Sequence, residues 1–282
     1  MTVRIITDSA ADLPHEVIAA NDIRVVPMWL TIGGSPVREN AVTVEDVVAR
    51  FDEGVTTAGP SPGDFVEAFD QLGEDDEALV LTVAEHLSST FESAFVGTKS
   101  LDPGAAHRIR VVSTDSAAGA QGLIVLHAAK AAQRGASLDD VEAAARRVMA
   151  QVRLVATLDS LEWLVKGGRV PSIAGWAGGA LHVRPVIELR PGGRIVPVRP
   201  AFGRDASLER VVHHWRRTIV PGHDLHIGAL HALAEDDAHR VLDMVRAEIE
   251  PATAFVTSFT TIMVAHTGPG LCGLAWWWEP RP

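Results

Sequence analysis

The sequence opens with Val3-Arg4-Ile5-Ile6-Thr7-Asp8-Ser9, an apolar β-branched run that ends in three polar residues. A run of this kind is typical of a strand buried in a sheet. Apolar runs return at residues 78–83 and 109–113, and the latter also ends in a polar triplet, Thr114-Asp115-Ser116. Helical patterns separate these runs, and Asp12 is expected to cap the first helix. Strands that alternate with helices predict a Rossmann-like α/β domain with a parallel sheet.

The pattern changes near Val152. Two strand-like runs, residues 186–189 and 195–198, flank Arg190-Pro191-Gly192-Gly193, which indicates a hairpin. The chain ends with two further strand-like runs, 255–264 and 274–278. We therefore predict two domains. Residues 1–152 form the parallel-sheet α/β domain, and residues 153–282 form an α+β domain with a mostly antiparallel sheet.

The composition excludes several classes of protein. A net charge of −11 over 282 residues repels the phosphate backbone, so we expect no nucleic-acid partner. The single cysteine, Cys272, permits no internal disulfide. No apolar run approaches the roughly 20 residues that span a bilayer, and the N-terminal apolar stretch is short for a signal peptide. We expect a cytoplasmic protein.

Motifs for common cofactors and metals are missing from the sequence. There is no G-x-G-x-x-G loop after the first strand, no Walker A sequence and no G-x-S-x-G elbow. The histidines show no HExxH spacing, and one cysteine cannot form a thiolate cluster. We expect neither a cofactor nor a bound metal.

Hydroxyl residues follow three of the predicted strands, in Thr7-Asp8-Ser9, Ser88-Ser89-Thr90 and Thr114-Asp115-Ser116. The carboxyl ends of parallel strands meet at one edge of the sheet, where ligands bind. Hydroxyl groups there suit an anionic headgroup such as a carboxylate. The alternative is that they only cap the helices that follow.

Basic and aromatic residues mark the second half. Lys166-Gly167-Gly168-Arg169 and Phe202-Gly203-Arg204 each place an arginine after a glycine turn, which suits a phosphate or leaves two solvated arginines. His266 is expected in a glycine-rich loop, either as a phosphate-binding or proton-transferring group or as a structural residue. Trp276-Trp277-Trp278 predicts either transient membrane contact or packing in a terminal strand, and we favour packing.

Several short motifs, taken in order along nearly the whole chain, resemble those of the DegV family. They are Thr7-Asp8-Ser9-Ala10-Ala11-Asp12-Leu13-Pro14, Val25-Val26-Pro27, Thr56-Thr57, Pro60-Ser61, Leu87-Ser88, Asp115-Ser116, Lys166-Gly167-Gly168-Arg169, Gly203-Arg204 and His266-Thr267-Gly268-Pro269-Gly270. The order of so many pieces makes the resemblance specific.

The resemblance implies a fatty-acid-binding protein, not an enzyme, in which two domains enclose one long-chain fatty acid. Some members of this family present the carboxylate to a fatty acid kinase, which forms an acyl phosphate for phospholipid synthesis. By this resemblance Thr57 and Ser88 bind the carboxylate, while Arg169, Arg204 and His266 form a rim that meets the phosphate or the kinase. A buried carboxylate needs donors and an acyl tail needs apolar walls, which agrees with this assignment.

The chain departs from the family pattern at Ala58-Gly59, at Ser89 and at Ala84-Glu85. Thr57 and Ser88 are retained, but the geometry of their loops and the preferred ligand are open. Two other functions remain as alternatives: a hydrolase or phosphotransferase acting on a small phosphorylated or ester substrate with His266 as acid or base, and a regulatory module that senses lipid.

Overall fold

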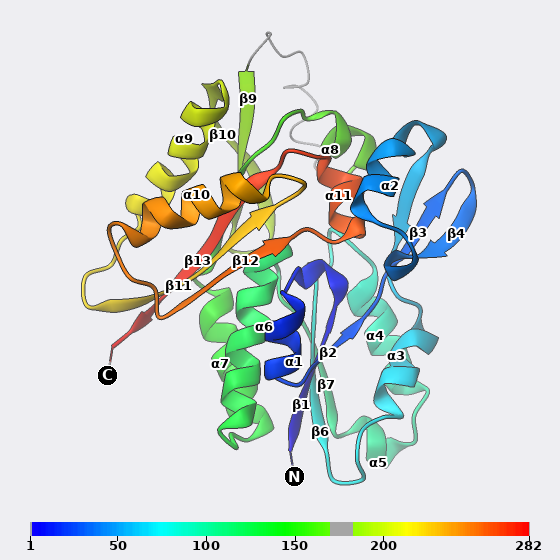
Figure 1. The fold of residues 1–282 in the computed structure, drawn as a ribbon. Helices are drawn as coiled ribbons and strands as arrows, with labels where there is room; N and C mark the ends of the chain where they lie inside the picture. The colour runs from blue at the N-terminus through cyan, green and yellow to red at the C-terminus, as the bar shows by residue number, and fades with distance from the viewer. Residues whose placement is uncertain (1, 170–182, 282) are drawn as a thin grey trace.

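The computed structural model describes residues 2–169 and 183–281, which form two large sheets with helices around and between them (Figure 1). The first sheet is parallel, with strand order β2-β1-β6-β7. Its strands are Ile23–Val26, Val3–Asp8, Glu77–Thr82 and Ile109–Ser113 in that order. The predicted Rossmann-like sheet is confirmed.

Helices cover both faces of the first sheet. One face packs against α3, Pro62–Phe69, and α4, Thr90–Lys99. The opposite face packs against α6, Ala118–Gln133, and α7, Leu138–Met149. Shorter elements complete this half: η1 Ser9–Ala11, α1 His15–Ala20, η2 Glu39–Ala41, α2 Val44–Ala49, η3 Phe51–Glu53 and α5 Pro103–Ala106.

The second sheet has six strands in the order β10-β9-β8-β13-β11-β12. They are Arg194–Phe202, Val183–Arg190, Arg153–Thr157, Cys272–Pro280, His223–His231 and Thr253–Ser258. Every neighbouring pair is antiparallel except β11 and β12, which are parallel. Helices α9, Arg204–Arg216, and α10, Glu235–Arg246, cover one face. The predicted mostly antiparallel sheet is confirmed.

Two local expectations were incomplete or wrong. A small antiparallel sheet, β4-β3-β5, formed by Ser35–Arg38, Trp29–Ile32 and Val55–Ala58, was not predicted. Residues 255–264 are not one strand, because β12 ends at Ser258 and helix α11, Thr261–Thr267, follows it. His266 therefore lies in the last turn of α11 and not in a loop.

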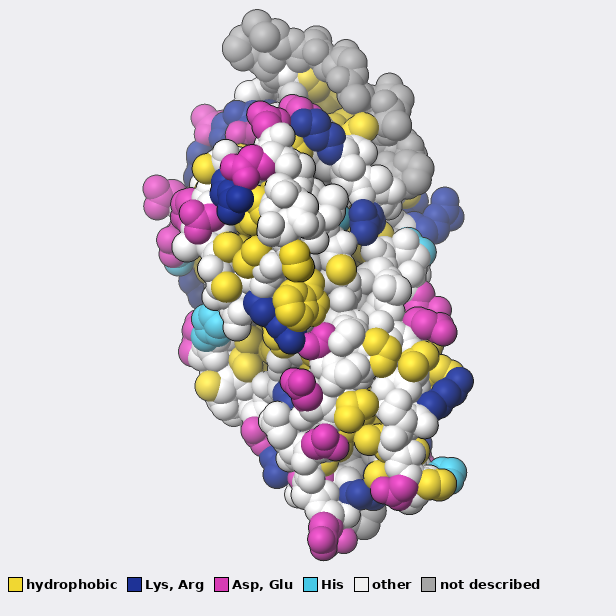
Figure 2. All heavy atoms as spheres, turned by 90° about the vertical axis from the view of Figure 1, so that its right-hand side faces the viewer, with side chains coloured by type: hydrophobic (Ala, Val, Ile, Leu, Met, Phe, Trp, Pro, Cys, Tyr) yellow, Lys and Arg dark blue, Asp and Glu magenta, His cyan; other side chains and the backbone are white. Residues whose placement is uncertain are grey.

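The right-hand face of Figure 1 belongs to this small sheet and its neighbouring helices. Figure 2 shows that charged side chains of both signs lie there among small groups of hydrophobic side chains. None of the helices formed by the described residues is both long enough and apolar enough to cross a membrane. Trp276, Trp277 and Trp278 are 1%, 3% and 6% exposed in β13, so these indoles pack in the core as we favoured.

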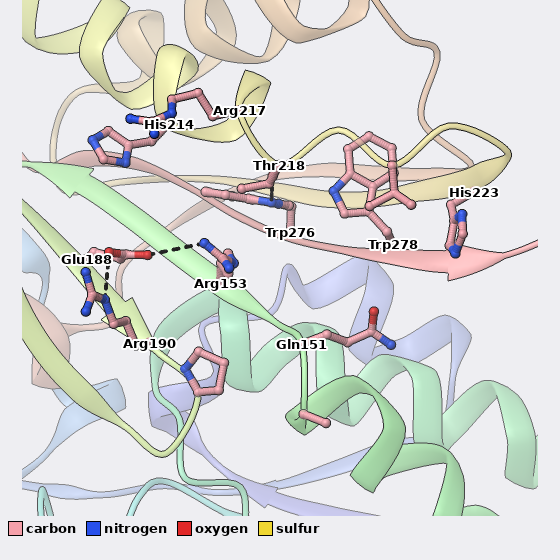
Figure 3. A pocket seen from close by; sticks show the side chains of 13 residues that line it. Gln151, Arg153, Glu188, Arg190, His214, Arg217, Thr218, His223, Trp276 and Trp278 are labelled. Atoms are coloured by element: carbon pink, nitrogen blue, oxygen red, sulfur yellow. Dashed lines mark hydrogen bonds and ion pairs between the residues drawn. The ribbon is translucent and has the colours of Figure 1, made fainter.

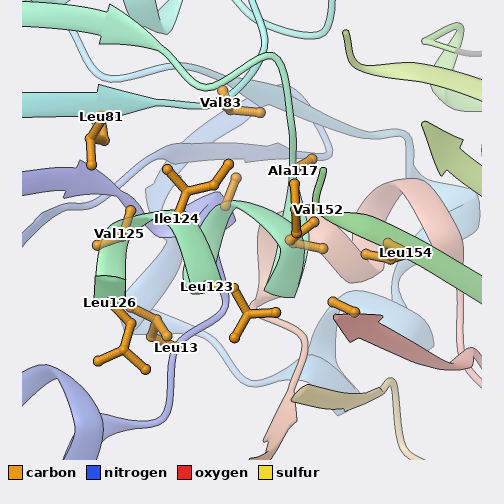
Figure 4. Packing of buried hydrophobic residues seen from close by; sticks show 14 of the residues in the cluster. Leu13, Leu81, Val83, Ala117, Leu123, Ile124, Val125, Leu126, Val152 and Leu154 are labelled. Carbon is orange, nitrogen blue, oxygen red and sulfur yellow. The ribbon is translucent and has the colours of Figure 1, made fainter. Parts of the chain in front are cut away.

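Helix α6 lies between the two sheets. Its buried residues occupy every side of the helix, and it packs against β1 of the first sheet and β11, β13 and β8 of the second. Figure 4 shows α6 in the middle of the large apolar cluster, which contains residues of both halves such as Leu81 and Leu154. A helix that is apolar on all sides requires burial on all sides. The two halves therefore share one core through α6.

Two glycines let α6 approach both partners closely. A Cβ at Gly119 would lie 2.4 Å from Leu230 Cδ2 on β11 of the second sheet. A Cβ at Gly122 would lie 2.6 Å from the backbone oxygen of Ala11 in η1. Real Cβ atoms do not come this close to backbone, so the hydrogen side chain of Gly122 is required for this packing.

We predict that Gly122→Ala lowers the free energy of unfolding by about 1–3 kcal/mol, because the added methyl group overpacks a contact with backbone that cannot rotate away. Urea denaturation followed by circular dichroism measures the change. Gly104→Ala in α5 is the control, since a Cβ there meets nothing within 4 Å. Equal stability of the two variants would contradict the required close approach of α6.

Candidate functional site

At two of the three strand ends, the hydroxyl side chains make hydrogen bonds within the protein. Thr7 Oγ1 donates to the carbonyl of Leu81 at 2.7 Å, and Thr114 Oγ1 donates to the carbonyl of Thr82 at 2.8 Å. Asp8 accepts from the backbone N–H groups of Ala10 at 3.0 Å and Val83 at 2.8 Å. These groups link neighbouring strands and cap η1. Helix capping, the alternative considered above, therefore holds for Asp8, whereas Thr114 joins two strands and α6 has no side-chain cap. The segment around Ser88 remains.

Ser88 lies at the turn that enters α4. Its Oγ is 2.7 Å from Oγ1 of the buried Thr90, so the two hydroxyls share a hydrogen bond. The end of β5 lies against this pair, because a Cβ at Gly59 would be 2.8 Å from Thr90 Oγ1 and 3.2 Å from Ser88 Oγ. The departure from the family pattern at Gly59 thus allows the β5 segment to approach the two hydroxyls.

Thr57 belongs to β5, two residues before Gly59, and its hydroxyl faces the second half of the chain. Thr57 Oγ1 lies 2.8 Å from His266 Nε2 and shares a hydrogen bond with it. Helix α11 brings His266 to this place, because α11 packs against α2, β5 and α8, Glu162–Gly167. The structure therefore gathers Thr57, Ser88 and His266 on adjoining segments of two halves.

The C-terminal residue of α8, Gly167, packs against the imidazole. A Cβ at Gly167 would lie 2.6 Å from His266 Nδ1, so this close contact requires glycine. Arg169 follows two residues later and donates from Nη1 to the carbonyl of Gly167 at 2.7 Å. Burial, helped by the positive charge of Arg169, lowers the pKa of His266 to about 4. His266 is therefore a neutral imidazole at physiological pH.

Arg204 makes its hydrogen bonds with groups other than His266 and Arg169. Its guanidinium donates to Asp237 Oδ2 at 2.7 Å, to Asp159 Oδ1 at 3.3 Å and to the carbonyl of Gly270 at 2.6 Å. Gly270 lies in the loop that follows His266, so Arg204 fastens this loop to the second sheet. No hydrogen bond between described residues joins Arg204 to His266 or Arg169. The structure brings Arg169 and His266 together and gives Arg204 two carboxylate partners.

A threonine hydroxyl and a histidine can act as nucleophile and base in catalysis. Beside Thr57 and His266, however, no described residue accepts a hydrogen bond from the second ring nitrogen, as the third member of a catalytic triad does. His266 Nδ1 is buried and has no hydrogen-bond partner among the described residues. A catalytic imidazole needs an acceptor at this nitrogen to fix its orientation, and a base with a pKa of about 4 is weak. The described residues also contain no cluster of three acidic, histidine or cysteine side chains arranged for a metal.

Buried acidic residues hold α11 in position. Asp12, expected to cap the helix after it, instead follows η1 with φ +45° and accepts from the backbone N–H of Thr260, the N-cap of α11, at 2.7 Å. The carbonyl of Glu39 accepts from Thr261 Oγ1 at 3.1 Å. Burial raises the pKa of Glu39 to about 7 and that of Asp12 well above its ordinary value. The first half thereby fixes the helix that carries His266.

Sequence reasoning missed several residues of this site. Thr90 was named among the hydroxyl residues of Ser88-Ser89-Thr90 but not as the partner of Ser88, and Gly59 was noted only as a departure. Gly167 was named as part of a phosphate loop, whereas its structural effect is contact with the imidazole. Asp159 gave no signal in the sequence, yet it contacts both Arg184 and Arg204. A single carboxylate in a loop has no pattern that reveals distant arginine partners.

Comparison with known proteins places these features in a family. The family described as "Uncharacterised protein, DegV family" matches residues 2–279. A DegV domain-containing protein of Streptomyces coelicolor is 31% identical over 281 residues, which cover 96% of this chain and 97% of the relative. A DegV domain-containing protein of Caldanaerobacter subterraneus is 26% identical over 277 residues, with 96% and 97% covered.

Solved structures share the whole architecture. A structure described as "Fatty Acid Binding of a DegV family Protein from Thermus thermophilus" superposes with a TM-score of 0.90 at 27% identity, covering 99% of this chain and all of the other. A DegV lipid-binding protein from Thermotoga maritima gives a TM-score of 0.87 at 25% identity, with both chains fully covered. The first of these neighbours is described as binding a fatty acid and the second as a lipid-binding protein.

The depressed pKa of His266 predicts a specific dependence on pH. Because the pKa falls from about 6.5 in the unfolded chain to about 4 in the folded protein, the unfolded chain binds more protons between these values. His266 thus contributes stability above pH 6.5 that is lost as the pH falls toward 4. In a ¹⁵N NMR titration the ring nitrogens of His266 should not titrate between pH 5.5 and 8.

Arg169→Gln tests the cause of this shift. Burial is the larger cause, so the variant should raise the pKa of His266 only in part and leave it below 6.5. Thr57→Val serves as the assignment variant, because it removes the only described partner of His266 Nε2. A His266 resonance that titrates near pH 6.5 in the parent protein would contradict the buried, neutral imidazole.

Proposed function

This chain belongs to the DegV family, and we propose that it is a carrier that buries one long-chain fatty acid between its two halves. The observation that carries the proposal is the hydrogen bond between Thr57 and His266, which joins polar groups of both halves at one place. Fatty-acid binding is what the neighbours from Thermus thermophilus and Thermotoga maritima are described as doing.

The carboxylate of the fatty acid would be bound by Thr57 and Ser88. Each hydroxyl already has a polar partner, His266 and Thr90 respectively, so each can turn its own hydrogen toward a ligand oxygen. A neutral His266 supports this role, because an N–H on Nε2 allows the Thr57 hydroxyl to accept from the ring and donate to the carboxylate. Charge-assisted bonds of this kind are strong where water is excluded.

The acyl tail would lie among side chains of the apolar cluster shared by the two halves. Leu87 precedes Ser88, and Met263 lies one turn before His266 on α11; both are partly buried and pack against this cluster. Apolar residues therefore begin directly beside the proposed carboxylate site. A long hydrocarbon chain gains about 0.8 kcal/mol for each CH₂ group that it buries.

We further propose that the bound carboxylate is presented to a fatty acid kinase, which forms the acyl phosphate. Arg169 and His266 would lie beside the new phosphate, and Arg204 would hold the loop that follows α11 through Gly270. The chemistry of transfer would belong to the nucleotide and metal ions of the kinase. A cytoplasmic location fits this partner and the lone, buried Cys272.

A fatty acid should copurify with the protein and be detected by native mass spectrometry. Ser88→Ala should weaken its binding by about 1–3 kcal/mol, because the charged carboxylate loses one donor. Ser89→Ala is the matched control, since Ser89 is exposed and its side chain makes no cap hydrogen bond. A lipid-exchange assay measures both. Equal affinity of the two variants would remove Ser88 from the site.

The rim is tested separately from fatty-acid binding. Arg169→Gln should leave the dissociation constant of the fatty acid within about twofold of the parent, because Arg169 is not placed among the carboxylate donors. It should depress acyl-phosphate formation by a fatty acid kinase at least tenfold, since a charged hydrogen bond to phosphate is lost. Loss of fatty-acid binding in this variant would assign Arg169 to the carboxylate site instead.

A further inference from the structure

A polar pocket lies on the face of the second sheet that α9 and α10 cover. Its volume is about 780 Å³, and it lies next to the C-terminal end of α9 (Figure 3). Helix α9 ends at Arg216, and side chains of β8, β9 and β13 line the pocket. None of Thr57, Ser88 and His266 lines this pocket.

The pairing register of β9, β8 and β13 places charged and aromatic side chains side by side in this pocket. Arg153 of β8 pairs with Trp276 of β13, and Val155, two residues after Arg153, pairs with Glu188 of β9. Side chains two residues apart on a strand share a face, so Arg153 lies between Glu188 and Trp276 on one face. Figure 3 shows the same arrangement, with the ion pairs of Glu188 drawn as dashed lines.

The charges in this pocket are not balanced. The buried carboxylate of Glu188 is shared by two arginines, with Arg190 Nε at 2.9 Å and Arg153 Nη1 at 3.6 Å. Arg217, at the end of α9, also lines the pocket, and its guanidinium has no hydrogen bond or ion pair within the described residues. Positive charge thus exceeds negative charge locally on a chain whose net charge is −11. Such a local excess attracts small anions.

A buried donor also lacks an acceptor in the same wall. Trp276 Nε1 donates to Thr218 Oγ1 at 2.8 Å, whereas Trp278 Nε1 has no hydrogen-bond partner among the described residues. Trp278 is 6% exposed and lines the pocket. A buried N–H without an acceptor is costly, so an oxygen supplied by a ligand would stabilise this arrangement.

We propose that this pocket binds a phosphate monoester of a small molecule. A tetrahedral phosphate offers several oxygens, which match the forks of Arg217 and Arg153 and the N–H of Trp278. The apolar edges of Trp276 and Val220 form a wall for the organic part of the ligand. The carboxylate of Glu188 neutralises part of the positive charge of Arg153 and Arg190, which lowers the affinity of the pocket for anions in general.

Indole N–H resonances of ¹⁵N-tryptophan-labelled full-length protein test this proposal, with Trp278→Phe used for assignment. Inorganic phosphate, AMP and vesicles containing phosphatidylglycerol are added in turn at constant ionic strength, with chloride as reference. AMP should shift the Trp278 resonance and bind more tightly than inorganic phosphate. Arg217→Gln should weaken AMP binding about tenfold or more, because one charged hydrogen-bond donor is lost.

Two further variants test whether AMP binds in this pocket and not elsewhere on the protein. Glu188→Gln should tighten AMP binding, because two arginines lose their shared carboxylate partner. Arg199→Gln, an exposed position of β10 outside the pocket, should leave it unchanged. An AMP response equal to that of chloride, or equal in the Arg217→Gln variant, would overturn the proposal. A response to vesicles without one to AMP would also overturn it.

Fatty-acid binding provides an independent readout. Arg217→Gln should retain the copurifying fatty acid, since Arg217 lies outside the carboxylate site. If the fatty acid is absent from the parent protein while AMP still shifts Trp278, the carrier function fails and the phosphate site stands. If the fatty acid is present and AMP gives no shift, the phosphate site fails alone.

Discussion

The burial of α6 on all sides is the constraint on which the rest of the structure depends. A helix with apolar residues around its whole circumference cannot face water, so it needs an apolar surface on each side. The parallel sheet supplies one surface and the mixed sheet supplies the other. Gly119 sets how closely α6 approaches β11 of the second sheet, and Gly122 sets how closely it approaches η1. The relative position of the two halves, and hence of Thr57 and His266, follows from this packing.

A second, polar connection fixes the details of the site. Asp12 accepts a hydrogen bond from the backbone N–H of Thr260, and Glu39 accepts one from Thr261, so the first half holds the start of α11. A helix of seven residues has little stability of its own, so such tertiary contacts determine whether it forms. His266 lies in its last turn and meets Thr57 there. The polar groups that would receive a carboxylate are thus positioned by the side chain of Asp12 and the backbone carbonyl of Glu39.

The two faces of the second sheet serve different purposes. Alternation along β8 directs Leu154 and Ala156 into the core around α6, whereas Val155 packs in the core under α9 and α10. Arg153 shares the face of Val155, at the pocket beside the end of α9. Charged side chains can occupy this position because they reach water there. One strand therefore contributes to an apolar interior and to a basic pocket.

Local hydrophobic patterns were enough to predict the parallel sheet and the mostly antiparallel sheet, and the polar residues that follow the apolar runs marked the strand ends. It did not predict the small sheet, since β5 consists of Val55–Ala58 within a turn-rich segment and forms only by pairing with β3. It placed His266 in a loop, because nothing near Thr260 reveals that Asp12 caps α11. The contact of His266 with Thr57, 209 residues away, and the binding of Arg204 by Asp159 and Asp237 became visible in the folded chain alone. Contacts between residues so distant depend on how the halves pack around α6, which no local pattern encodes.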